Sequence, residues 1–267
     1  MTIEDLLRIM AMLRDAEHGC PWDREQTFQT IVPHTLEEVY EVADTIERGD
    51  YAHLANELGD LLLQIVFYAQ LGKEAGHFDF DDVVNEIAHK LLTRHPHVFP
   101  AATMESFGTR ENITPDQVEG NWETIKQAER EGKRQQPASL LDDIPATFPA
   151  LTRARKIQKR AATAGFDWPD AAGVLDKVRE EVGELNEAMA EHGREHVEEE
   201  MGDLFFSLVN LSRHLRIDPE CSLRRANAKF EARFRQLEQQ VAAEGKILGQ
   251  LSLEEMEACW QAIKAAE

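Results

Sequence analysis

Hydrophobic residues recur at helical spacing along most of the chain, and we find no convincing alternation of the kind that marks a strand. The sequence therefore predicts an all-α fold. The predicted helices cover Ile3–Leu13, Thr35–Arg48, Tyr51–Leu71 and Phe80–Thr93, then Ala150–Ala164, Ala171–Glu191, Glu195–Leu215 and Ser222–Ala243. The segments that follow Asp60 and Asp203 are apolar around much of the helix, so we expect them to be central and buried.

The polar positions of these helices carry the same pattern of four carboxylates twice. Within each quartet, successive acids are 3, 16 and 3 residues apart. The quartets are Glu38, Glu41, Glu57 and Asp60, and Glu181, Glu184, Glu200 and Asp203. Each close pair is one helical turn apart, so its two members project from one helix face. The longer gaps contain Gly49-Asp50 or His192-Gly193, which are typical of turns. Each copy predicts a helical hairpin that points four acids at one place.

Carboxylates gathered in this way repel one another unless a cation lies among them. Hard oxygen ligands without a nearby cysteine suit Mg²⁺, or Mn²⁺, better than zinc. In a chain with 30% charged residues, one Glu-x-x-Glu pair is usually solvated helix surface. Two copies with equal spacing, each beside an apolar helix, instead favour a metal site.

The repetition extends beyond the acids. A Lys and an Arg four residues apart follow each quartet, and such pairs can bind phosphate oxygens. Two tryptophans in each copy are also matched, and they fit a hydrophobic core and base stacking equally well. These matched residues are Lys90, Arg94, Trp22 and Trp122 in the first copy and Lys229, Arg233, Trp168 and Trp260 in the second. We interpret the chain as a tandem duplication, with domains at 1–130 and 140–267 and a linker at 131–139.

Length and charge agree with this interpretation. The 267 residues suit two domains of about 130 residues each. A net charge of −21 argues against binding to nucleic acid or to an anionic membrane. Glu4, Asp5 and Arg8 interrupt any signal peptide, and the most apolar stretch, Leu61–Leu71, is too short to span a membrane. Three scattered cysteines favour a reducing compartment, so we expect a cytoplasmic protein.

The motif Glu180-Glu181-x-x-Glu184 with Glu200-x-x-Asp203 resembles the EExxE…ExxD signature of MazG nucleoside triphosphate pyrophosphohydrolases. Glu37-Glu38-x-x-Glu41 with Glu57-x-x-Asp60 matches it equally. The resemblance covers essentially the whole chain, including Gly19-Cys-Pro-Trp-Asp23, Arg94-His-Pro-His-Val-Phe99 and Lys156-Ile-Gln-Lys-Arg160. It implies two MazG-like helical bundles, a homodimer, Mg²⁺ dependence, and hydrolysis of NTPs or dNTPs to the monophosphate and pyrophosphate.

We expect the main site in the second copy, because Lys177 lies one turn before Glu181 where the first copy has His34. Its expected metal ligands are Glu181, Glu184, Glu200 and Asp203, with Glu180 added to the catalytic set. The expected substrate contacts are Lys177, Glu180, His196, Glu199, Lys229, Arg233 and Trp260. His196 departs from the Lys that family members often have at that position. A weaker second site is expected at Glu38, Glu41, Glu57, Asp60, Lys90 and Arg94.

Two other function classes remain to be weighed. A ferritin-like di-iron bundle needs Glu-x-x-His on two helices, whereas every close acid pair here ends in Glu or Asp. A helical regulator that senses nucleotides with little turnover is the remaining alternative. A turnover assay separates the enzyme from the regulator.

Overall fold

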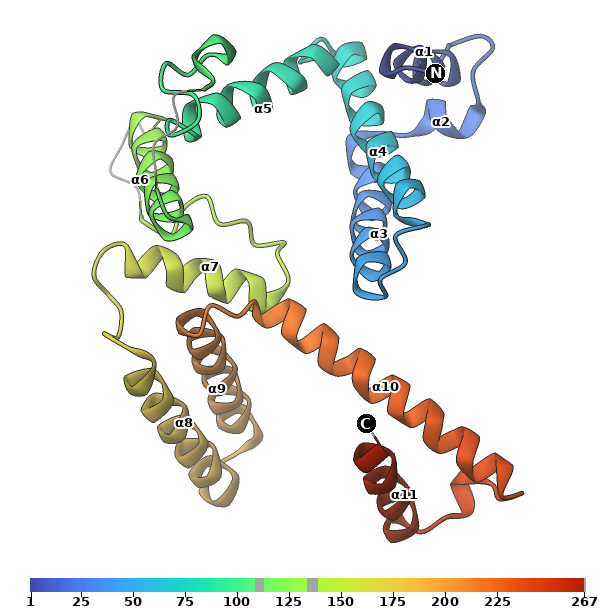
Figure 1. Ribbon diagram of the computed structural model, residues 1–267, viewed down its shortest axis with the longest axis vertical. Coiled ribbons are helices and arrows are strands. Elements are labelled where there is room, and N and C mark those ends of the chain that lie inside the picture. Colours follow the sequence, from blue (N-terminus) through green and yellow to red (C-terminus); the bar gives the residue numbers. More distant parts are fainter. Residues whose placement is uncertain (109–112, 134–138, 267) are drawn as a thin grey trace. The chain divides into compact units, whose positions relative to one another are not determined.

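The computed structural model describes residues 1–108, 113–133 and 139–266. Within these ranges every regular element is a helix (Figure 1), so the all-α prediction is confirmed. The chain divides into two compact units, Met1–Gln135 and Gln136–Glu267, and each is described by itself. Of the predicted linker 131–139, residues 131–133 are helical and residues 134–138 lie outside the described residues.

The two units contain the following elements. The first has α1 (Ile3–Leu13), α2 (Pro21–Glu25), α3 (Phe28–Glu47), α4 (Leu54–Ala75), α5 (Phe80–Arg94), η1 (Met104–Ser106) and α6 (Pro115–Lys133). The second has α7 (Ala150–Ala162), α8 (Ala171–Glu191), α9 (Arg194–His214), α10 (Pro219–Ala243), η2 (Leu248–Gln250) and α11 (Leu253–Ala266).

Each unit is organised around a helical hairpin, as predicted. Helices α3 and α4 pack against each other in the first unit, and α8 and α9 do so in the second (Figure 1). Gly49 in the first turn has a φ of 70°, a conformation that suits glycine because it has no Cβ. The acids lie on the facing helices of these hairpins.

Helix α3 begins at Phe28, seven residues before the predicted start at Thr35. The cause is a capping box, in which the Thr27 side chain accepts from the amide of Thr30 and the Thr30 side chain accepts from the amide of Thr27. Pro33 lies inside the helix, although proline usually marks a boundary. The cap starts the helix early enough for Pro33 to fall within its second turn.

The core of the first unit is a small cluster of buried side chains, Met10, Ile31, Val66, Phe67 and Leu71. Arg14, whose side chain is 8% exposed, ties this core to the segment before α3. Its guanidinium donates to Glu74 at 2.7 and 2.9 Å, to the carbonyl oxygen of Gln26 at 3.3 Å and to that of Asp23. Because its partners come from both segments, Arg14 holds α2, the short helix that carries Trp22, against α4.

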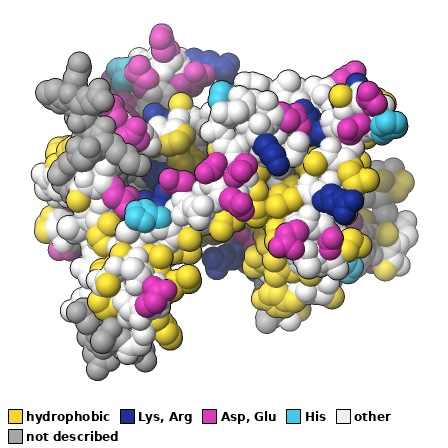
Figure 2. Space-filling model, turned by 90° about the horizontal axis from the view of Figure 1, so that it is seen from above, with side chains coloured by type: hydrophobic (Ala, Val, Ile, Leu, Met, Phe, Trp, Pro, Cys, Tyr) yellow, Lys and Arg dark blue, Asp and Glu magenta, His cyan; other side chains and the backbone are white. Residues whose placement is uncertain are grey.

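The expectation that the apolar helices α4 and α9 are central and buried holds for only part of each helix within a single chain. On α9, Val209 is buried, but Phe205 and Phe206 are 54% and 43% exposed, and on α4 Leu62 and Ile65 are also exposed. A groove of about 930 Å³ between α7, α9 and α10 is lined by both phenylalanines. Hydrophobic side chains are visible at the molecular surface beside acidic ones (Figure 2). Each of these helices has more apolar faces than its own unit covers.

Candidate active site

Three carboxylates of the second quartet converge across the α8–α9 hairpin. Oxygen atoms of Glu181, Glu184 and Glu200 all lie within 4.8 Å of one another. Glu181 is only 4% exposed, whereas Glu184 points outward. The shorter Asp203, one turn along α9 from Glu200, is not part of this group.

Lys177 is the cation that contacts this cluster within the chain. Its Nζ lies 2.8 Å from a carboxylate oxygen of Glu180, 2.8 Å from one of Glu181 and 4.0 Å from one of Glu184. Hydrogen bonds that the Lys177 ammonium donates to Glu180 and Glu181 raise the pKa of Lys177, so the ammonium stays charged. One ammonium group therefore partly neutralises the acids of α8.

The cluster is still short of positive charge. Partial desolvation raises the pKa of Glu184; the attraction of Lys177 works against this, and the negative charges of Glu181, Glu180 and Glu200 add to the rise. A raised carboxyl pKa means that ionisation at neutral pH costs free energy in the folded protein. An added cation would remove that cost.

His196 and Glu199 lie at the edge of the same site. The two rings of His196 and His192 stack with centroids 4.6 Å apart. Nδ1 of His196 is 3.4 Å from Glu199 and its Nε2 is 3.6 Å from Glu200. Sequence reasoning did not select His192; its position four residues before His196 was a usable signal, although His192 follows the end of α8 and α9 begins only at Arg194.

Lys229, Arg233 and Trp260 do not join the acids within one chain. Lys229 and Arg233 lie on α10, which lines the groove with its first turns and then diverges from the α8–α9 hairpin (Figure 1). Further along, α10 packs against α11, where the ring of Trp260 lies 5.1 Å from that of Phe230. These three predicted substrate contacts thus lie on α10 and α11, whereas the acids lie on α8 and α9.

The first unit repeats the acid cluster with a different neighbour. Oxygen atoms of Glu38, Glu41 and Glu57 lie within 4.8 Å of one another. Burial raises the pKa of Glu38, and the charges of Glu41, Asp60 and Glu37 raise it further. In place of Lys177 this unit has His34, whose Nδ1 is 3.9 Å from Glu37. The first cluster thus lacks the close ammonium contact of the second.

The basic pair of the first unit is already engaged. Arg94 forms two hydrogen bonds with the carboxylate of Glu129 on α6, at 2.6 and 3.1 Å. Nζ of Lys90 lies 3.3 Å from Glu86, one turn earlier on α5. The Arg94–Glu129 pair was not foreseen, because its members are 35 residues apart and Arg94 had been considered only as a phosphate ligand. In the structure it fastens α6 to α5.

Comparison with known proteins identifies the family. The model of the MazG nucleotide pyrophosphohydrolase domain matches residues 26–99 and 171–237, which include both acid hairpins. The chain belongs to the MazG family. This confirms the resemblance found in the sequence, and the two matched segments confirm the tandem arrangement of MazG domains.

Two relatives match this chain along nearly their whole length, and a third matches over about half of its own. The chain is 51% identical to the nucleoside triphosphate pyrophosphohydrolase of Escherichia coli K12, with 99% of this chain and 98% of the relative covered. It is 41% identical to the Thermotoga maritima nucleoside triphosphate pyrophosphohydrolase/pyrophosphatase MazG, with coverage of 99% and 96%. A Mycolicibacterium smegmatis nucleoside triphosphate pyrophosphohydrolase is 34% identical over 61% of this chain and 48% of its own length.

No helix among the described residues is long and apolar enough to cross a membrane.

Charge repulsion among the acids of the second MazG domain predicts that removing one of these charges stabilises the metal-free protein. In chelator, Glu184→Gln should raise the midpoint of thermal unfolding relative to the unsubstituted protein. The sign follows because the pKa of Glu184 is raised above 4.5 in the folded state. The folded state then binds more protons than the unfolded state, so its stability falls as pH rises through this range. The advantage of Glu184→Gln should accordingly appear above about pH 4.5.

With added Mg²⁺ or Mn²⁺, the unsubstituted protein should instead have a higher unfolding midpoint than Glu184→Gln, because a cation that binds only the folded state stabilises it. Differential scanning fluorimetry with either salt measures this effect. Glu187→Gln is the matched control, since Glu187 is an exposed acid on α8 outside the cluster. An equal response of all three proteins to metal would contradict a metal site here.

Proposed function

We propose that the protein hydrolyses nucleoside triphosphates, NTPs or dNTPs, to the monophosphate and pyrophosphate in a Mg²⁺-dependent reaction. The observation that carries the proposal is the convergence of Glu181, Glu184 and Glu200 beside Lys177 in a MazG domain. The relatives at 51% and 41% identity, both named as nucleoside triphosphate pyrophosphohydrolases, support the same activity.

The donor set fits Mg²⁺. All the converging groups are carboxylates, and the pKa of Glu184 is raised first by desolvation and then by its acidic neighbours, as expected for a site that needs a cation. We propose Glu181, Glu184, Glu200 and Asp203 as the ligands. When bound, Mg²⁺ would neutralise phosphate charge and polarise phosphoryl oxygens. Mn²⁺ has similar oxygen preferences and is the second candidate.

The chain's own groups have distinct proposed roles. Lys177 is placed to meet phosphate oxygens beside the carboxylates, while Lys229 and Arg233 would bind the outer phosphates. Water then attacks the α-phosphorus. The bond between the α-phosphorus and the oxygen that bridges it to the β-phosphorus breaks, so that pyrophosphate leaves. A carboxylate of the acid set, which includes Glu180, accepts the proton of the water.

We further propose a homodimer. The exposed phenylalanines of α9 and the groove beside them support it, because burying such a side chain contributes roughly 1.5–3 kcal/mol. In a dimer, Lys229 and Arg233 on α10 of one protomer can also approach the acids of the other protomer. Within one chain, α10 diverges from the acid hairpin (Figure 1).

The reaction outcome gives the first test. With ATP and Mg²⁺ we expect AMP and pyrophosphate as the products, because the outer two phosphates leave together. Chelator should stop the reaction. Anion-exchange chromatography of the nucleotides, with an enzymatic assay for pyrophosphate, measures both products. Detection of ADP and free phosphate as the main products would contradict the mechanism. Nucleotide binding without turnover would favour the alternative, a nucleotide-sensing regulator.

The second test concerns the division of labour between the two MazG domains. Glu200→Ala should nearly abolish turnover, while Glu57→Ala should retain most of it. The reason is that His34 gives the first site one charged phosphate contact fewer than Lys177 gives the second. Such a contact contributes about 1.5–3 kcal/mol. Steady-state pyrophosphate release from the two full-length variants measures the difference. If the fragment Met1–Gln135 hydrolysed nucleotides as fast as the whole chain, the proposed division would be wrong.

The third test measures assembly by light scattering after size-exclusion chromatography. The chain of 30.3 kDa should elute as a particle of about twice that mass. Phe205→Glu should shift it toward the monomer, because the substitution puts a charge into the proposed contact. Met104→Glu is the control, since Met104 is an exposed apolar residue of the other unit. A monomeric unsubstituted protein would contradict the dimer.

A further inference from the structure

The segment before α8 carries Trp168, whose indole lies directly over Gly173. A Cβ added to Gly173 would be 2.7 Å from Cδ1 of Trp168 and 3.6 Å from Cγ and Nε1. The indole therefore occupies the space into which a side chain at position 173 would project. Trp168 is nevertheless 38% exposed, so part of its ring is open to solvent rather than packed in a core.

Position 173 shares a helix face with the acid site. Residues 173, 177, 180 and 184 follow one another at intervals of 4, 3 and 4, which keeps them on one stripe of α8. With a rise of 1.5 Å per residue, Gly173 lies about 12 Å along the axis from Glu181. The indole and the carboxylates thus lie at the two ends of one surface, with the ammonium of Lys177 between them. A nucleotide with its phosphates at the acids would extend its base toward the indole.

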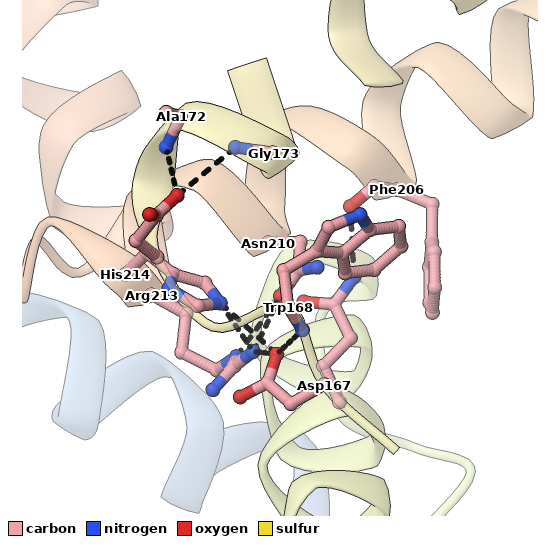
Figure 3. Close-up of polar contacts among 10 residues, drawn as sticks. Asp167, Trp168, Ala172, Gly173, Phe206, Asn210, Arg213 and His214 are labelled. Carbon is pink, nitrogen blue, oxygen red and sulfur yellow. Dashed lines mark hydrogen bonds and ion pairs between the residues drawn. The ribbon is translucent and has the colours of Figure 1, made fainter. Parts of the chain in front are cut away.

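A polar network fixes the segment that carries Trp168. Figure 3 shows the Asp167 carboxylate receiving hydrogen bonds from Arg213 and from Nε2 of His214, the latter at 3.0 Å, and from the amide of Trp168 at 2.9 Å. Burial raises the pKa of Asp167, but the hydrogen bonds and charges of Arg213 and His214 outweigh this and hold it below its usual value. Arg213 also donates to Oδ1 of Asn210. The end of α9 therefore anchors the start of the tryptophan segment.

The first unit also has a tryptophan beside its acid helix, but its contact lies four residues further along that helix than the contact of Trp168 with Gly173. The ring of Trp22 meets the ring of His34 edge-on at 5.8 Å, and His34 occupies the position that corresponds to Lys177. Trp22 is 52% exposed. Here the anchor is Arg14, which binds the carbonyl oxygens of Asp23 and Gln26, instead of a buried carboxylate. The two units thus share the placement of the ring beside the acid helix, although their anchors differ.

We propose that Trp168 is the surface on which the base of the nucleotide stacks, and that Asp167 is a positioning residue that holds it there. The proposal rests on the function proposed above and adds the part of the site that receives a planar heteroaromatic base. It also assigns binding roles to Asp167 and Trp168, which lie outside the acid motif. An exposed aromatic face accepts any base, so this contact supports affinity for nucleotides in general.

The test compares a substrate that has a base with an inhibitor that has none. On the full-length protein with Mg²⁺, Trp168→Ala should raise the KM for ATP about tenfold and leave kcat nearly unchanged, because stacking on one aromatic side chain commonly contributes this much affinity. Inhibition by inorganic triphosphate, which lacks a base, should be unchanged. Trp168→Phe should restore most of the lost affinity. Phe166→Ala should behave as the unsubstituted protein, since Phe166 is an 80% exposed aromatic of the same segment.

Asp167→Ala should raise the KM for ATP in the same direction as Trp168→Ala while inhibition by inorganic triphosphate stays the same. An unchanged KM for ATP in Trp168→Ala would overturn the proposal. Equal loss of affinity for ATP and for inorganic triphosphate would also overturn it, because that result indicates a general structural role.

A fluorescence experiment separates this proposal from the proposed hydrolysis. In a variant with Phe at positions 22, 122 and 260, Trp168 is the only tryptophan of the four. ATP should quench its emission, whereas inorganic triphosphate should not. If the unsubstituted protein releases no pyrophosphate, quenching of Trp168 by ATP in the variant would still support the base surface, while the hydrolase would be rejected. Pyrophosphate release without any effect of bound ATP on Trp168 emission would do the reverse.

Discussion

The mutual repulsion of carboxylates held on facing helices is the constraint on which the rest of this structure depends. A helical hairpin can present acids at one place because residues three or four apart share a face. It can do so at neutral pH only where other charges offset the repulsion, and the raised pKa of Glu38 and Glu184 indicates that the offset is incomplete in both units. In the second unit, Lys177 supplies part of the positive charge that offsets the repulsion. In the first unit, His34 occupies the corresponding position. The difference between the two sites is therefore a difference in how far the chain neutralises its own acids.

The features that sequence reasoning predicted well are local. Two hairpins, the helix faces that carry the acids, and the contact of Lys177 with Glu181 all follow from spacing within one or two helices. Helix α3 starts seven residues before the predicted Thr35, because a capping box that needs only Thr27 and Thr30 begins it at Phe28. That signal was present in the sequence, and it concerns the backbone rather than the hydrophobic pattern.

The features that were missed depend on contacts between distant segments. Arg94 meets Glu129 from 35 residues away, and nothing in either neighbourhood distinguishes this pair from other charged helix residues. The apolar pattern of α9 correctly marked Val209 for burial, yet it marked Phe205 in the same way. A hydrophobic pattern states that a face must be covered, but it does not state whether the same chain or another copy covers it. For the same reason the sequence could not locate Lys229 relative to the acids.

Gly173 has a consequence for protein engineering. Replacing an exposed helix glycine by alanine is a standard route to higher stability, since glycine in a helix interior costs up to about 1 kcal/mol relative to alanine. At Gly183, where an added Cβ would meet nothing within 4 Å, the exchange has no steric cost within the chain. At Gly173 the same methyl group would collide with the indole of Trp168 and displace it from the helix. A design procedure that ranks positions by helix propensity would treat the two glycines alike. At position 173, however, the gain in helix stability would come with displacement of the aromatic ring that lies beside the acid site.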